Sequence, residues 1–242
     1  MIVLFTDFGL EGPYIGQMQA VLHRKAPNVP VVNLFADVPP FDPQGAAYLL
    51  SAYTGEFPPG TVFLCVIDPG VGTNRRAALV GADRRWYVGP DNGLFNIVAA
   101  RARDLRWWDV TWRPARLSAS FHGRDLFAPV AAALALGEMP PAEEQNPALR
   151  LRTGWPDDLG RLIYVDGFGN AMTGIRAASL PASASLDIRS HRFPRARTFS
   201  DVPAGAAFWY ENANGLAEVA VNQGCANEEL GLRVGDPVVV VS

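Results

Sequence analysis

Short runs of apolar residues alternate with amphipathic segments through the first part of the chain. The runs are typical of buried strands, and they lie at residues 2–6, 31–35, 62–67, 86–89 and 105–109. Between them, apolar side chains recur at helical spacing from Tyr14 until Pro27, and further helices are predicted at 43–53, 93–102 and 124–136. Strands that alternate with helices predict an α/β domain with a mostly parallel central sheet.

This periodicity lapses between residues 139 and 155, where proline and acidic residues are frequent. Such a stretch is typical of a linker. We therefore predict an α/β domain over residues 1–150, a linker over 139–155 and a second domain over 156–242. The second domain contains short strand-like runs separated by Gly, Pro, Asn and Asp, at 162–165, 208–211, 216–221 and 238–241. That spacing predicts a small antiparallel β-barrel or sandwich.

Composition narrows the possible functions. Because 49% of the residues are hydrophobic, the chain can form a folded core. A net charge of −3 without clusters of Lys and Arg argues against nucleic acid as a partner. No apolar run reaches membrane-spanning length, and the N-terminal run is too short for a signal peptide. We expect a cytoplasmic protein with no membrane partner, in which Cys65 and Cys225 stay thiols.

Polar clusters stand where predicted strands hand over to loops. Thr6-Asp7-Phe8-Gly9 follows the first strand, and the segment from Asp68 to Arg75 follows the central strand. A third cluster, residues 121–125 with His122 at its centre, precedes a predicted helix. Ligands of parallel α/β sheets bind at the carboxyl ends of the strands. These three clusters are therefore the candidate site.

Each cluster also has a purely structural interpretation. Asp7 taken alone is better explained as a turn or capping residue, and Asp68 before a proline can simply start a turn. Arg75 can be a surface ion-pair partner. His122 is balanced between the two interpretations, because an imidazole beside glycine at a loop-to-helix junction suits both a ligand site and a structural role.

Other chemistries are disfavoured by the residues present. Lys25 is the single lysine, and no glycine loop precedes it, so neither a Schiff base nor a P-loop is expected. No histidine has the spacing of a metal ligand pair, so we expect no metal. In the second domain, Asp166-Gly167-Phe168-Gly169-Asn170 follows a strand; a tight turn explains its glycines, and a ring-stacking ligand is the rival explanation for Phe168.

Taken together and in order, the motifs resemble those of one family over nearly the whole chain. They are TDFG at Thr6, DPGVGTNRR at Asp68, PDNGL at Pro90, SFHGRDLFAP at Ser120, DGFGN at Asp166, TFSD at Thr198 and the closing ENANGLAEVAVNQGCANEELGLRVGD. This set is similar to the S-adenosyl-L-methionine (SAM) hydrolases that form adenosine, also called SAM hydroxide adenosyltransferases, which are relatives of the SAM-dependent fluorinase and chlorinase. Any one motif alone would be weak.

The resemblance implies a homotrimer of subunits with an α/β domain and a C-terminal β-barrel, in which neighbouring subunits share each site. It implies that Asp68, Arg75 and His122 handle the attacking water and that the ribose diol is held by Asp7. The other implied substrate-binding residues, which surround the adenosine and methionine parts, are Phe8, Phe41, Phe121, Asp166, Phe168, Asn170 and Phe199.

The residue types suit hydrolysis at the ribose C5′ carbon, which gives adenosine and L-methionine. A sulfonium departs as a neutral thioether, so no metal or cofactor is needed, and SAM itself is the substrate. The difficult step is activation of water, for which a guanidinium, a carboxylate and an imidazole are suitable groups. Three departures from the family pattern concern the methionine end: Gly12, Gly174 and Ala213 stand where relatives commonly carry an acid, an Asn and a Ser.

Two other functions fit part of this pattern. A SAM-dependent halogenase would need a pocket for an anion, which the Asp68 carboxylate would repel. A non-catalytic SAM or adenosine sensor would keep the pocket without needing the three polar residues. The presence of Asp68, Arg75 and His122 favours hydrolysis over both.

Overall fold

The computed structural model describes residues 1–241, which form two compact units. The first comprises Met1–Thr153 and the second Gly154–Ser242. The two units are described separately.

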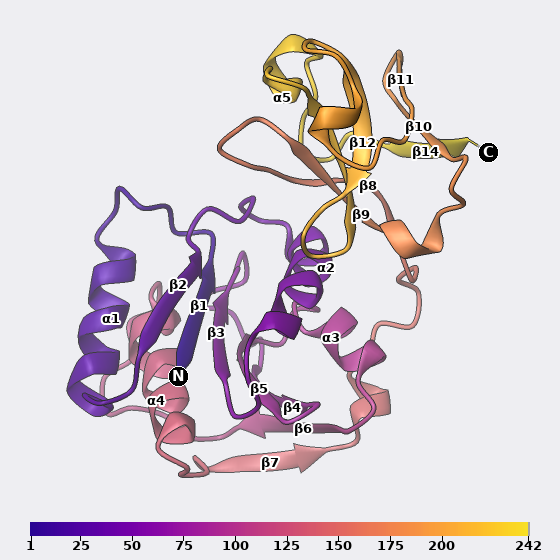
Figure 1. The fold of residues 1–242 in the computed structure, drawn as a ribbon. Coiled ribbons are helices and arrows are strands. Elements are labelled where there is room, and N and C mark those ends of the chain that lie inside the picture. The colour runs from indigo at the N-terminus through magenta and orange to yellow at the C-terminus, as the bar shows by residue number, and fades with distance from the viewer. Residues whose placement is uncertain (242) are drawn as a thin grey trace. The chain divides into compact units, whose positions relative to one another are not determined.

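A mixed seven-stranded sheet forms the centre of the first unit (Figure 1). Its strand order is β2-β1-β3-β5-β4-β6-β7. The first four strands in this order are mutually parallel, and the pairs that involve β4, β6 and β7 are antiparallel. The strands are β1 (Ile2–Thr6), β2 (Val31–Phe35), β3 (Val62–Val66), β4 (Ala77–Ala82), β5 (Arg85–Pro90), β6 (Leu105–Val110) and β7 (Ala142–Gln145). The sheet thus has a parallel core with an antiparallel extension.

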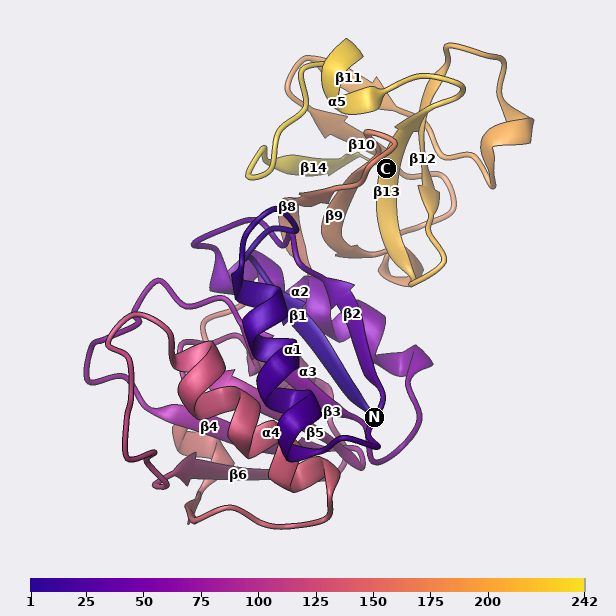
Figure 2. The same cartoon turned by 90° about the vertical axis from the view of Figure 1, so that its left-hand side faces the viewer.

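Helices cover both faces of this sheet. Helix α1 (Tyr14–Lys25) packs beside α4 (Ala128–Ala135) on one face (Figure 2). Helix α2 (Pro43–Tyr53) packs with α3 (Asn96–Arg101) on the opposite face (Figure 1). Because side chains alternate along a strand, Leu4 and Leu64 join the core under α1 and α4. All residues of β1 and β3 are buried, as expected for strands covered on both sides.

Several predictions for this unit needed correction. The sheet is mixed, because β4 pairs antiparallel with both β5 and β6. This strand was not predicted, since its sequence AALVGA has few β-branched residues. The segment 139–155 is not simply a linker, since residues 142–145 form β7 and pair with β6. The predicted helix at 93–102 spans only Asn96–Arg101, and the one at 124–136 begins as a π-helical turn, η2 (Gly123–Phe127). Such π turns are frequent at functional sites.

The second unit is built from two antiparallel sheets. One has the order β11-β10-β14 and the other β12-β13-β9-β8. Isolated bridges join Arg161 to Pro237 and Arg195 to Trp209, so backbone contacts exist between the sheets near both of their edges. The elements are β8 (Leu159–Val165), β9 (Ala171–Arg176), β10 (Ser185–Ile188), β11 (His191–Phe193), β12 (Ala207–Glu211), β13 (Leu216–Val221), α5 (Ala226–Glu229) and β14 (Val238–Val241).

Candidate functional site

A cavity of about 370 Å³ lies in the first unit where β1 and β3 end. These strands are adjacent and parallel, so the loops that leave Thr6 and Val66 start side by side. Six of the predicted site residues line this cavity: Asp7, Phe8, Phe41, Asp68, Phe121 and His122. The strand-end clusters recognised in the sequence therefore come together in one place.

Arg75 connects the two polar ends of the site. Its Nε donates to Asp68 Oδ1 at 2.6 Å, and its Nη2 donates to Asp68 Oδ2, which makes the pair bidentate. The same Nη2 lies 3.0 Å from His122 Nδ1. The exposed fractions of the Arg75 and Asp68 side chains are only 9% and 5%, so this ion pair is largely removed from water. Such an Arg–carboxylate fork holds both groups in one geometry.

The contact with Arg75 fixes the tautomer of His122. A guanidinium has only donors, so Nδ1 must accept, and the ring proton of the neutral imidazole is on Nε2. Burial and the positive charge of Arg75 lower the pKa of His122, with Asp68 acting in the opposite direction. His122 is therefore a neutral ring that presents an N–H group at Nε2.

Close packing between two loops brings His122 to Arg75, which lies 47 positions earlier in the chain. Gly72 has a φ of +81°, and a Cβ atom there would lie 2.8 Å from the carbonyl oxygen of Ala119. Only glycine allows this approach. The second loop is closed by Asp125, whose Oδ2 accepts from the Ser118 N–H at 2.8 Å.

Asp7 and Phe41 form another part of the cavity wall. Burial raises the pKa of Asp7, and the negative charge of Asp68 adds to this, while backbone N–H groups of Asp7 and Phe41 lower it. Phe41 has a φ of 62° and an exposed fraction of 77%. A bulky residue in the left-handed region is strained. Phe41 is therefore a strained and exposed aromatic residue in the cavity wall.

Three aromatic rings close one side of the cavity. Phe8, Tyr14 and Phe121 lie with ring centroids 5.2 to 5.7 Å apart. Sequence analysis did not single out Tyr14 as a site residue. It begins α1 but is 47% exposed, whereas Ile15 and Met18 carry the buried stripe of that helix. An aromatic residue that lies off the buried stripe next to the Asp7 loop was the signal available for it.

The four site residues predicted in the second unit also lie together. Asp166, Phe168, Asn170 and Phe199 line a hollow of about 820 Å³. Asp166 Oδ1 accepts from the N–H groups of Phe168 and Asn170, both at 2.9 Å, which builds the tight turn. That turn leaves Phe168 81% exposed. A ring held in solvent by a turn suits a face that a ligand or another surface covers.

The same hollow includes residues that sequence analysis did not assign to the site. Tyr210, Cys225 and Glu229 are among them. Tyr210 lies 5.2 Å from Phe199 between ring centroids, and its hydroxyl donates to the buried Glu218 at 2.5 Å. The sequence pattern around Tyr210 predicts the strand in which it lies. It does not indicate that Tyr210 lines this hollow.

Gly174 has a packing explanation. It lies in β9 opposite Leu159, and a Cβ atom on it would lie 2.6 Å from the Cβ of Leu159. Glycine is therefore required by the pairing of β8 with β9, which gives this departure a packing reason.

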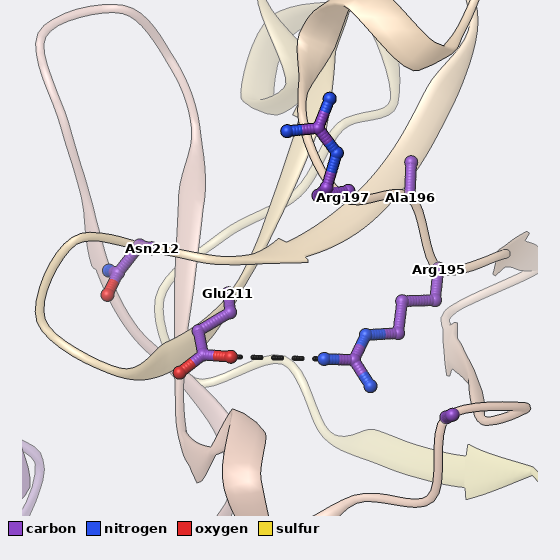
Figure 3. Close-up of a pocket in the computed structure, with 6 residues that line it drawn as sticks. Arg195, Ala196, Arg197, Glu211 and Asn212 are labelled. Atoms are coloured by element: carbon purple, nitrogen blue, oxygen red, sulfur yellow. Dashed lines mark ion pairs between the residues drawn. The ribbon is translucent and has the colours of Figure 1, made fainter.

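A further hollow, of about 630 Å³, is lined in the second unit by Arg195, Arg197, Glu211 and Asn212 with two alanines (Figure 3). Arg195 Nη2 lies 3.8 Å from Glu211 Oε2, and Arg197 pairs with Asp201. None of the predicted site residues lines it. Among residues 1–241, no three His, Cys, Asp or Glu side chains are grouped so as to hold a metal ion, and no helix is long and apolar enough to cross a membrane.

Comparisons with known proteins agree on one family. The N-terminal domain model of the SAM hydroxide adenosyltransferases matches residues 2–144, and the C-terminal domain model matches residues 160–239. A protein of Thermus thermophilus named (R)-S-adenosyl-L-methionine hydrolase is 42% identical, and the match covers 98% of both chains. A fluorinase of Nocardia brasiliensis is 24% identical over 99% of this chain and 96% of its own.

The fold is also shared with solved structures. The crystal structure of an uncharacterized conserved protein from Thermotoga maritima superposes with a TM-score of 0.85 at 30% identity, covering 100% of both chains. With both family models matched in order, and with the strand-end residues of the expected pattern gathered in one cavity, the chain belongs to the SAM hydroxide adenosyltransferase family.

Proposed function

We propose that this protein hydrolyses SAM at the ribose C5′ carbon and releases adenosine and L-methionine. The observation that carries the proposal is the hydrogen-bonded Asp68–Arg75–His122 arrangement at a cavity that also contains a carboxylate and several aromatic rings. Asp7 is suited to hold the ribose diol, and the rings are suited to stack on adenine and to lie against a cationic sulfonium.

The three polar residues divide the work on water. Asp68 still has free lone pairs on both oxygens beside its bonds to Arg75, so it accepts the proton of the attacking water. His122 donates from Nε2 to the water oxygen and orients it. Sequence reasoning expected both Asp68 and His122 to accept the proton; the contact of His122 Nδ1 with Arg75 favours Asp68 alone. Arg75 holds the other two in position and stabilises negative charge on the oxygen.

Water and SAM are the only reactants that this step needs. An oxygen–C5′ bond forms, the C5′–sulfur bond breaks, and its electron pair neutralises the sulfonium. We propose that no metal or cofactor takes part, because the leaving group is a neutral thioether. The expected result is full activity in the presence of EDTA; a loss that added metal restores would contradict this.

We further propose a homotrimer in which the hollow around Asp166, Phe168, Asn170 and Phe199 of one subunit completes the cavity of its neighbour. The exposed rings of Phe41 and Phe168 support this, since each lacks a cover within its own unit. The bridges between the two sheets support a barrel in the second unit, and the free thiols of Cys65 and Cys225 fit a cytoplasmic location.

The test is incubation with SAM followed by chromatography. Adenosine and methionine in equal amounts are expected. S-adenosylhomocysteine as the main product would contradict the proposal, a halogenated adenosine formed with halide would favour the fluorinase-like alternative, and bound but unchanged SAM would favour a sensor. Because the Thermus relative is named for the (R) form, both sulfonium epimers are supplied separately, and faster turnover of the (R) epimer is expected.

A further inference from the structure

The turn after β5, residues 91–94, belongs to the PDNGL motif, and no step of the proposed reaction uses this motif. Strand β5 is parallel to β3 and approaches it closely, since a Cβ atom on Gly89 would lie 2.2 Å from the carbonyl oxygen of Cys65. The turn therefore leaves the sheet beside the end of β3, where Asp68 begins the catalytic loop.

Asn92 ties this turn to the residue just before Asp68. Its Nδ2 donates to the carbonyl oxygen of Ile67 at 2.8 Å, and its Oδ1 accepts from the N–H of Leu94 at 3.2 Å. The two contacts use the donor end and the acceptor end of one amide, so its orientation is determined. Ile67 itself is fully buried. The Asn92 side chain thus fixes the peptide from which Asp68 extends.

The same turn supports the partner of Asp68. The backbone N–H of Asp91 donates to the carbonyl oxygen of Arg76 at 3.0 Å, and Arg75 Nη1 donates to that same oxygen at 3.2 Å. The turn therefore contacts the backbone next to both members of the ion pair: Asn92 binds the carbonyl before Asp68, and Asp91 binds the carbonyl after Arg75. Asn92 is not among the residues that line the cavity within the described part of the chain, so it is not placed to touch the substrate.

We infer that Asn92 is a positioning residue for hydrolysis, which orients the Asp68 carboxylate through the Ile67 carbonyl. This inference rests on the proposed role of Asp68. Asn92 would affect only the orientation of the Asp68 carboxylate, which accepts the proton in the transition state. Its loss should therefore lower the rate and leave the binding of SAM unchanged. A displacement of a catalytic group by a fraction of an ångström to an ångström costs on the order of 10- to 100-fold in rate.

The decisive variant is Asn92→Asp. It keeps the size and the oxygen that accepts from Leu94, so the turn is preserved, but it replaces the donor to Ile67 with an oxygen. Asn96→Asp is the matched control, because Asn96 makes the same type of side-chain contact to the backbone of Arg152, away from the cavity. Asn92→Ala is the second variant, in case the carboxylate of the first disturbs folding.

Single-turnover rate, SAM dissociation constant and melting temperature are measured for each. Asn92→Asp is expected to lower the rate about 10- to 100-fold with little change in the dissociation constant, whereas Asn96→Asp changes the melting temperature and keeps the rate. The double variant Asn92→Asp, Asp68→Asn should be scarcely slower than Asp68→Asn, because the two residues act as one unit.

Three results would contradict either the positioning role of Asn92 or the proposed role of Asp68. Unchanged rate in both Asn92 variants, while Asp68→Asn is inactive, overturns the positioning role and leaves the proposed function intact. Equal losses of rate and melting temperature in the Asn92 and Asn96 variants also overturn it, by making Asn92 merely structural. Full activity of Asp68→Asn would instead contradict the proposed role of Asp68, on which the inference depends.

Discussion

Replacement of Arg75 by lysine tests whether the geometry of the guanidinium, and not its charge alone, is needed. Arg75 makes four contacts: two with Asp68, one with His122 and one with the carbonyl oxygen of Arg76. A lysine ammonium keeps the charge but is a single point on a flexible stem, so it cannot satisfy the Asp68 fork and the imidazole together. Asp68 and His122 would then lose their common support.

The expected loss follows from these contacts. Charged hydrogen bonds contribute about 1.5–3 kcal/mol each, and lysine loses at least two of them. A rate loss of 10²- to 10⁴-fold corresponds to about 2.7–5.4 kcal/mol, which is close to the roughly 3–6 kcal/mol that two such contacts supply. We therefore expect Arg75→Lys to lower the single-turnover rate by about 10²- to 10⁴-fold. The dissociation constant of SAM should change far less, because these groups act on the water.

The adjacent arginine provides the control. Arg76 has an exposed fraction of 58% and lies 3.3 Å from Asp109, outside the site. Arg76→Lys should be nearly neutral, since surface pairs contribute at most about 1 kcal/mol. The reasoning is refuted if Arg75→Lys keeps a rate within tenfold of the parent, or if its loss of activity is explained by weaker SAM binding.

Three more outcomes are expected. Asp7→Asn should raise the dissociation constant of SAM by more than it lowers the single-turnover rate; a pure rate effect would remove Asp7 from the binding groups. NMR titration should give His122 a pKa below 6.5, and Arg75→Ala should raise it, because burial and the Arg75 charge favour the neutral ring; an unshifted pKa in the variant contradicts this. Glu218→Leu should destabilise the protein by about 1–3 kcal/mol in urea unfolding, because the Tyr210 hydroxyl and the Asn212 amide lose their buried acceptor; equal stability to the parent would argue against those contacts.

The pH dependence of stability gives a separate check on Glu218. Burial raises its pKa above 4.5, and the hydrogen bonds from Tyr210 and Asn212 only partly offset this. A raised carboxyl pKa means that the stability it contributes is full below pH 4.5 and is lost as the pH rises through the folded-state pKa. The difference in unfolding free energy between the parent and Glu218→Gln should therefore vary over the pH range just above 4.5, and a constant difference would contradict the assignment.

Local pattern was sufficient for the parallel core. The predicted strands at 2–6 and 31–35 and the helix at 43–53 have these same bounds in the structure. Runs of apolar and β-branched residues predicted both strands, although only the first is fully buried and the second lies at the sheet edge with largely exposed or half-buried residues. The antiparallel extension was not predictable in this way. Strands β4 and β7 have Ala-, Gly- and Glu-rich sequences, and they become strands because β5 and β6 offer backbone partners.

Some residues of the candidate site were found from the sequence, and others only from the structure. The clusters at the strand ends made Asp7, Asp68 and His122 candidates beside equally available structural explanations, and the resemblance to a family gave them their expected roles. Tyr14 and Asn92 were not found, because their sequence context is that of an ordinary helix start and an ordinary turn. Their importance depends on which ring or carbonyl lies opposite them, and packing decides that.

The chain by itself determined its family, its parallel strands and the residue types of its chemistry, because these depend on local spacing and on motif order. Tertiary structure alone decided that one guanidinium joins Asp68 to His122, that the imidazole accepts at Nδ1, and that Asn92 supports the strand end. These are contacts between segments up to 47 residues apart, whose distance is set by loop closure and close glycine packing. No periodicity in the sequence encodes such a distance.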